Sequence, residues 1–222
     1  MPIKKLNSLI MEFAKYLLYL PFVGLLFYGC SGSDATIINY INPSLNSSVI
    51  KSASLLPLHN TITQQNTSLG TANMAEIDNM IQMEFASKNS KTQMLDPKSS
   101  TELLKKFNLI NSYDTLITDY DNTNIPNVQI FNRIGQNLKV DAIIQGFLVK
   151  LFQRDGHVWN PSYQGETKIT IKYVMFSTNS GEVLWEATCE GYKSVSSLKN
   201  APSISDMIEI IRDKIIDALP TL

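Results

Sequence analysis

The sequence predicts an α/β domain (α+β in the broad sense) with a single mixed β-sheet and helices packed on it. Between residues 75 and 138, apolar residues recur at helical spacing. A near-continuous apolar run then covers 140–151, which is typical of a central strand buried on both faces. Two segments that alternate between apolar and polar residues follow, 166–176 and 182–192, with a turn at Asn179-Ser180-Gly181 between them. We therefore expect these two segments to pair as an antiparallel hairpin.

The elements are expected in the order β-α-β-α-(α)-α-β-β-β-α. Three strands after the helices imply a meander within a mixed sheet. In the last helix, Ile208, Ile211 and Ile215 form an apolar stripe, and Ser203 is placed to cap its first turn. The predicted strands are 49–58, 92–95, 140–151, 166–176 and 182–192, and the predicted helices are 75–88, 99–107, 111–121, 128–138 and 204–219.

Composition narrows the class of protein. The chain has 222 residues, of which 44% are hydrophobic and 18% charged, and its formal net charge is −1. This balance argues against a protein that holds nucleic acid electrostatically, so no nucleic-acid partner is expected. The chain is too apolar to be disordered, and its two cysteines are too few for a disulfide scaffold. A globular domain with an appendage remains.

The start of the chain has the parts of an export signal. The beginning is basic, with Lys4, Lys5 and Lys15. An uncharged apolar run follows at residues 16–28. As a helix this run would cover about 20 Å, which is less than the hydrocarbon core of a bilayer. We expect residues 1–29 to be a signal peptide, with translation starting at Met1 or at Met11.

Cys30 makes the signal more specific. A cysteine directly after Gly29, at the end of the apolar run, resembles the lipobox of bacterial lipoproteins. The resemblance implies cleavage between Gly29 and Cys30 and a covalent lipid on the Cys30 thiol, which labelling with palmitate detects. Several acyl chains exceed the single chain that gives only marginal membrane binding. An ordinary cleaved signal and an uncleaved anchor are the alternatives. Ser31 in place of aspartate resembles the signal for outer-membrane sorting.

Residues 30–48 are expected to be the lipidated cysteine and a mostly flexible tether. The segment is rich in serine and asparagine, contains Gly32 and Pro43, and lacks sustained periodicity. Its few isoleucines leave room for some packing against the domain. The α/β domain itself is then expected over residues 49–222.

Three short motifs of the domain resemble a known group of proteins. They are the strand Leu55-Leu56-Pro57-Leu58 followed by Asn60, the run from Leu138 to Gly146 (LKVDAIIQG), and the run from Ser180 to Ala187 (SGEVLWEA). Together they resemble the domain of CsgG-type lipoproteins, a group similar to the N-terminal domain of TolB and to the lipoprotein activators of penicillin-binding proteins. The resemblance implies an outer-membrane, periplasm-facing protein that is not an enzyme and that docks to envelope proteins or assembles into rings.

The sequence contains no pattern typical of a catalytic or metal site. His59 and His157 have no cysteine or carboxylate at metal-ligand spacing and are expected to be solvent-facing loop residues. Cys189 shares an apolar strand face and is expected to be a buried, inert thiol. No nucleophile motif and no glycine-rich phosphate loop occurs. We therefore expect no enzyme activity, no metal and no cofactor other than the lipid on Cys30.

The loop from Phe152 to Gly165 is the best surface candidate. It carries Trp159 and Tyr163, and exposed aromatic residues on a loop tip are typical of interaction hot spots. The alternative is that Trp159 folds back to cover the edge of the sheet.

Two functions from different classes follow from these observations. The first is a lipid-anchored protein on the periplasmic side of the outer membrane that acts by binding other envelope proteins or by self-association. The alternative is a subunit of a CsgG-like secretion channel or oligomeric ring. A channel would need membrane-crossing hairpins of alternating residues, and the polar loop 60–71 and the glycine- and proline-containing loop 152–165 disfavour it.

Overall fold

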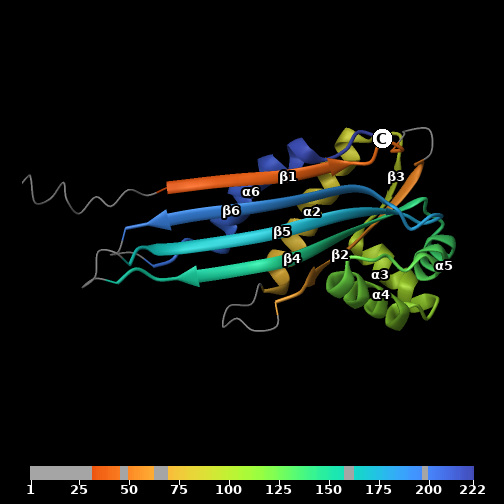
Figure 1. The fold of residues 1–222 in the computed structure, drawn as a ribbon, viewed down its shortest axis with the longest axis horizontal. Coiled ribbons are helices and arrows are strands. Elements are labelled where there is room, and N and C mark those ends of the chain that lie inside the picture. Colours follow the sequence, from red (N-terminus) through yellow and green to blue (C-terminus); the bar gives the residue numbers. More distant parts are fainter. Residues whose placement is uncertain (1–31, 46–49, 63–69, 158–162, 197–199) are drawn as a thin grey trace, which may run out of the picture.

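The computed structural model describes residues 32–45, 50–62, 70–157, 163–196 and 200–222. Figure 1 shows long strands that run side by side with helices on both sides of them. In chain order the elements are β1 (Gly32–Ile41), β2 (Ser52–Asn60), α2 (Thr71–Lys88), β3 (Gln93–Leu95), α3 (Pro97–Lys106), α4 (Ile110–Thr123), α5 (Val128–Leu138), β4 (Ala142–Arg154), β5 (Gly165–Ser177), β6 (Val183–Val195) and α6 (Ile204–Ala218). The predicted α/β class is confirmed.

The sheet has six strands in the order β1-β6-β5-β4-β2-β3. The predicted meander is present, because β4, β5 and β6 pair in sequence and antiparallel. Strand β2 pairs parallel with both β3 and β4 through helical crossovers, so the sheet is mixed as predicted. The predicted antiparallel hairpin is present, and Ile171 lies opposite Cys189 and Met175 opposite Trp185.

Helices cover the two faces of the sheet with separate cores. Helices α2 and α6 pack on one face, where Phe85 and Ile211 meet the strand residues Ile171 and Trp185. Helices α3, α4 and α5 pack on the opposite face, but only near the turn between β5 and β6 (Figure 1). Phe131 and Tyr120 stack there on Phe176, at centroid distances of 4.4 and 4.8 Å. The long strands therefore extend beyond the second helical layer.

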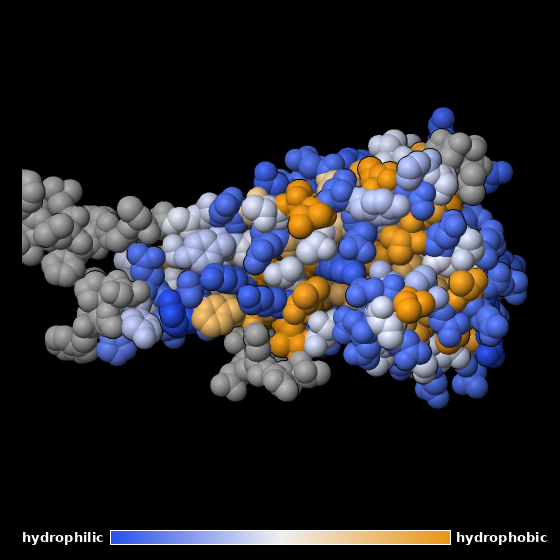
Figure 2. Space-filling model, viewed as in Figure 1, coloured by the Kyte–Doolittle hydropathy of each residue, from blue (hydrophilic) through white to orange (hydrophobic). Residues whose placement is uncertain are grey.

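The part of this second face that no described helix covers is called the open face. It consists of residues that share one side of their strands by register: Asp34, Thr36, Ile38 and Tyr40 of β1, Glu186, Thr188, Glu190 and Tyr192 of β6, Glu166, Lys168 and Thr170 of β5, and Lys150, Phe152 and Arg154 of β4. Lys172 of β5 marks its border, because its ammonium group donates to Asn124 Oδ1 at the end of α4. Figure 2 shows mainly hydrophilic residues on this side, with isolated hydrophobic ones. Opposite charges face each other across strands, as in the Lys172–Glu186 pair at 3.6 Å.

Helix caps follow the local sequence. Asp96 accepts a hydrogen bond from the Ser99 N–H at the start of α3, where Pro97 occupies the first turn. Asn127 caps α5 through the Ile130 N–H. The predicted cap Ser203 belongs to a capping box, in which Ser203 and Asp206 each accept from the other's backbone N–H.

The prediction of a mostly flexible tether over residues 30–48 is wrong for residues 32–41. These residues form strand β1, which pairs antiparallel with β6 along its whole length. Ala35 and Ile37 pack against the core, whereas most of the strand is exposed. Strand β1 lies at the edge of the sheet and most of its residues are exposed to solvent. Its sequence therefore carries little hydrophobic periodicity, and the local sequence pattern did not predict it. The first predicted strand is also displaced and begins at Ser52.

Candidate functional site

Of the predicted site residues, the structure describes Tyr163. Gly29, Cys30 and Trp159 lie outside the described residues. Tyr163 is described, and 47% of it is exposed. The predicted signal peptide and residues 30, 31 and 46–48 of the predicted tether also lie outside the described part of the chain. The structure therefore bears on this site through the residues that flank it.

Four strands end together in one row, which we call the Gly32 end of the sheet. Gly32 of β1 lies opposite Ser194 of β6, Ser194 opposite Glu166 of β5, and Glu166 opposite Arg154 of β4. The Gly32 N–H donates to Ser194 Oγ at 3.4 Å, so β1 is held from its first residue. In Figure 1 this is the left end, where β1 begins and β4 and β6 finish.

Tyr163 is held against the Gly32 end by an arginine. The guanidinium of Arg154 lies over the Tyr163 ring, 5.1 Å from its centroid, and forms an ion pair with Glu166 at 3.1 Å. The backbone carbonyl of Tyr163 accepts from the His157 N–H at 3.0 Å. The flanks of the predicted interaction loop are thus ordered by the strands from which they emerge.

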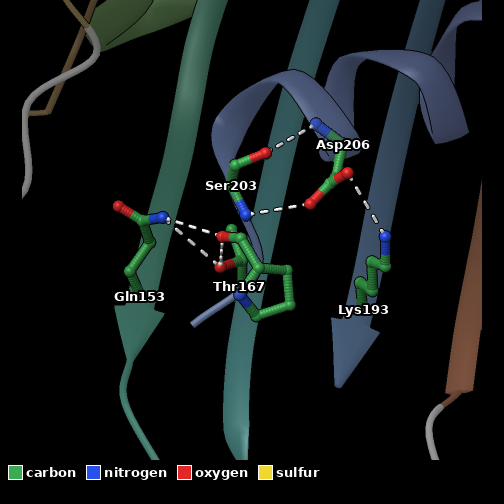
Figure 3. A network of polar contacts seen from close by, with 6 residues as sticks. Gln153, Thr167, Lys193, Ser203 and Asp206 are labelled. Atoms are coloured by element: carbon green, nitrogen blue, oxygen red, sulfur yellow. Dashed lines mark hydrogen bonds and ion pairs between the residues drawn. The ribbon is translucent and has the colours of Figure 1, made fainter. Parts of the chain in front are cut away.

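The start of α6 is tied to three strands at this end (Figure 3). Thr167 Oγ1 on β5 donates to the Pro202 carbonyl at 2.7 Å, and Gln153 Nε2 on β4 donates to the same carbonyl at 3.1 Å. Lys193 on β6 forms an ion pair with Asp206 at 3.5 Å. At the Gly32 end, β4, β5 and β6 are therefore held together by side-chain contacts with the start of α6.

A buried carboxylate that the sequence analysis missed lies on α2. Asp78 is 5% exposed, and its two oxygens lie 3.2 and 3.0 Å from the Leu58 N–H that donates to them. The pairing of β2 with β4 is irregular between Leu56 and His59, so Asp78 satisfies an amide near the irregularity. Burial raises the pKa of Asp78 to about 7, although the Leu58 N–H opposes the shift. The sequence signal for the burial of Asp78 is that it directly follows the apolar residue Ile77.

Asp78 also lines a surface cleft of about 710 Å³ between α2 and α3. Pro57 and Met74 contribute apolar walls, and Lys98 and Glu102 stand at its polar side. The carboxylate is already engaged by the backbone of β2, so its evident role is to stabilise that strand. The remaining lining residues are Ala75, Asn79, Gln82, Asp96, Pro97, Thr101 and Lys105.

The other chemically reactive side chains are dispersed. His59 lies within β2, edge-on to the Phe147 ring, so the expectation of a loop position is wrong for it. His157 is exposed beside the end of β4. Cys189 is buried as predicted, and burial raises the pKa of its thiol to about 11. Within the described ranges, no three His, Cys, Asp or Glu side chains gather in a way that would hold a metal ion.

None of the helices that the structure describes combines the length and the apolar character needed to cross a bilayer. No protein-family model matches the sequence. No curated protein matches it either.

Several solved structures align with part of this chain. PelC, a dodecamer from Paraburkholderia phytofirmans, aligns with 85% of this chain and 99% of its own at a TM-score of 0.48 and 11% identity. Lipoprotein GNA1162 from Neisseria meningitidis aligns with 75% of this chain and 95% of its own at a TM-score of 0.49 and 13% identity. The C-terminal domain of LpoB from Escherichia coli aligns with 67% of this chain and 87% of its own, at 0.38 and 12%.

The structural neighbours thus include a bacterial lipoprotein and a protein that forms a dodecamer. Likenesses of this strength assign neither a family nor an activity to the chain.

Proposed function

We propose that this protein is a lipid-anchored lipoprotein of the bacterial cell envelope that acts by binding other proteins and not by catalysis. The observation that carries the proposal is Cys30, which directly follows an apolar run with a basic start. In the sequence, strand β1 of the folded domain begins two residues after that cysteine. The lipid on Cys30 is the only covalent group that the proposal requires, and it includes no cofactor and no metal.

The finer location is part of the same proposal. Ser31 after the lipidated cysteine favours the outer membrane, with the domain on the periplasmic side. The motifs at 55–58, 138–146 and 180–187 favour a domain of the CsgG or TolB N-terminal type. In the structure they supply the middle of β2, the first residues of β4 and the turn into β6, which are structural roles.

The open face is the surface on which we expect a protein partner. Ile38 is 78% exposed and Tyr40 is 50% exposed, and both project from the same side of β1. Tyr40 lies opposite Glu186, which forms an ion pair with Lys172. Apolar side chains surrounded by satisfied polar groups are typical of the centre of a transient interface.

The anchor is tested by Cys30→Ala in the full chain. We expect the variant to leave the membrane fraction and to lose the label from metabolically supplied palmitate. The matched control is Cys189→Ala, because that thiol is buried and should not carry lipid. Unchanged labelling and unchanged membrane association of Cys30→Ala would overturn the proposal.

The partner surface is tested by photo-crosslinking in intact cells. A photoreactive residue at Ile38 or Tyr40 is expected to capture a defined envelope protein or a second copy of this chain. The same residue at Lys91, which is exposed in the turn after α2, is the control. Identical products from all three positions would contradict a contact on the open face.

A further inference from the structure

The described fold begins two residues after Cys30, and it begins inside a paired strand. An extended chain advances at most about 3.6 Å per residue, so Cys30 lies within about 7 Å of Gly32. The connection between Cys30 and β1 is therefore too short to act as a spacer. A lipid on Cys30 would bring the Gly32 end of the sheet to the surface of the bilayer.

Resting on the lipid anchor proposed above, we propose that the domain stands on the bilayer with the Gly32 end of its sheet against the phospholipid headgroups. The strands then run away from the membrane. Residues 178–182, in the turn between β5 and β6, are about 40 Å from the Gly32 end, because β5 spans Gly165 to Ser177 and a strand rises by about 3.4 Å per residue.

A second contact point sets the orientation. Arg154 and Tyr163 lie at the same end of the sheet as Gly32. They lie across the sheet from Gly32, because β5 and β6 separate β4 from β1. Three strand spacings correspond to about 14 Å. Tyrosine and arginine each join an apolar body to a polar tip, which suits the headgroup layer. This assigns Tyr163 to the bilayer surface and not to a protein partner.

The hydrogen bonds and the ion pair at the Gly32 end join α6 to β4, β5 and β6, so the sheet should take up this orientation as one unit. The Pro202 carbonyl accepts hydrogen bonds from both β4 and β5, and Asp206 pairs with Lys193 of β6. Figure 3 shows that these contacts gather α6 and three strands at one point. Helices α3, α4 and α5 are then held away from the membrane, and the open face rises from the bilayer toward them, so that a periplasmic partner can reach it from the side.

The test uses the lipidated full protein, purified from membranes and reconstituted into phosphatidylcholine vesicles that contain a lipid with a quencher on its headgroup. Single fluorescent labels are placed on cysteines introduced by His157→Cys, Ile41→Cys or Ser180→Cys, and His157 is chosen because it is exposed at the same end as Tyr163 and leaves that side chain in place. Cys30 is blocked by the lipid and Cys189 is buried, so neither takes up the label. We expect quenching at position 157 and none at position 180 or at position 41, which lies at the opposite end of β1.

A second variant tests whether the short connection is the cause. An insert of 20 Gly/Ser residues between Ser31 and Gly32 has a root-mean-square span of about 25 Å, so the quenching at position 157 should be lost while the protein stays bound. Quenching at position 41 that equals or exceeds the quenching at position 157 would mean that the strands lie along the bilayer, and would overturn the orientation alone. A protein that carries no lipid and does not bind the vesicles would overturn the proposed anchor as well.

Discussion

The indole N–H of Trp185 donates to Asn39 Oδ1 at 2.9 Å, and the Ala218 carbonyl oxygen lies at the same distance from that nitrogen. One fully buried side chain on β6 therefore joins β1 to α6. Together with the backbone pairing of β1 to β6, this contact holds residues 32–41 in the sheet, although their sequence is typical of a tether. It also links the stability of β1 to the core.

Removing this link should loosen β1. Asn39→Ala deletes one hydrogen bond and should lower the free energy of unfolding by about 1 kcal/mol. Trp185→Phe leaves both acceptors without the indole donor and leaves space beside α6, so a loss of about 2–4 kcal/mol is expected. Denaturant unfolding measures both values. Hydrogen exchange should show faster exchange of the β1 amides in either variant, and protection equal to that of the native protein would contradict the role given to Trp185.

Asp78 should make stability depend on pH. Burial raises its pKa from 3.8 to about 7 in the folded protein. Between these two values the folded state binds more protons than the unfolded state, so the free energy of unfolding falls as pH rises from 4 to 7. The loss is at most about 4 kcal/mol, at 1.36 kcal/mol per pKa unit.

Asp78→Asn should remove this dependence, because the amide oxygen still accepts from the Leu58 N–H and does not titrate. Relative to the native protein, the variant should gain stability as pH rises from 4 to 8 in urea titrations. The same change at exposed Asp119 is the control. A constant difference between the native protein and Asp78→Asn across this range would show that Asp78 does not titrate as described.

Gly135 should tolerate no side chain. A Cβ added there would lie 2.3 Å from Thr178 Cβ, where α5 packs on the end of β5. Thr178 cannot easily move, because its hydroxyl donates to the Val140 carbonyl at 2.8 Å. We expect Gly135→Ala to cost about 1–3 kcal/mol in thermal or chemical unfolding. Gly32→Ala is the control, since its Cβ would meet only Ser194 Oγ at 3.8 Å. Equal effects of the two changes would refute the close contact.

The capping box of α6 should contribute to the rigidity of the Gly32 end. Ser203→Ala removes the acceptor of the Asp206 N–H at 3.1 Å, and the loss of such a cap typically costs about 1 kcal/mol. Ser203→Asp keeps an acceptor at this position and is the conservative comparison. Hydrogen exchange should report faster opening of the first turn of α6 in Ser203→Ala only. If both variants open alike, the cap contributes nothing measurable.

The elements that sequence pattern predicted well are those whose signal is local. The alternation in 166–176 and 182–192 determines which residues of β5 and β6 face the core, and Ile171 and Cys189 do so. The isoleucine stripe of α6 and its Ser203 cap are likewise set by residues within one or two turns. In these elements, the residues that are buried in the structure are those that the sequence pattern predicted to be buried.

Much of the candidate site could not be predicted, because it depends on contacts between distant residues. No local pattern shows that β1 pairs with β6, since Gly32 and Ser194 are separated by most of the chain. The same holds for Asp78, whose partner Leu58 lies on another element. Trp159 and Cys30 stay predictions, because they lie outside the described residues.

The sequence alone determined the order of the elements after residue 49, the inward faces of the hairpin, and the presence of a lipobox-like cysteine after an apolar run. Only the tertiary structure decided that the segment following this cysteine is a strand and not a spacer. The physical reason is that β1 gains its stability from backbone pairing with β6 and from the Trp185–Asn39 hydrogen bond, which are contacts that residues 32–41 cannot encode by themselves.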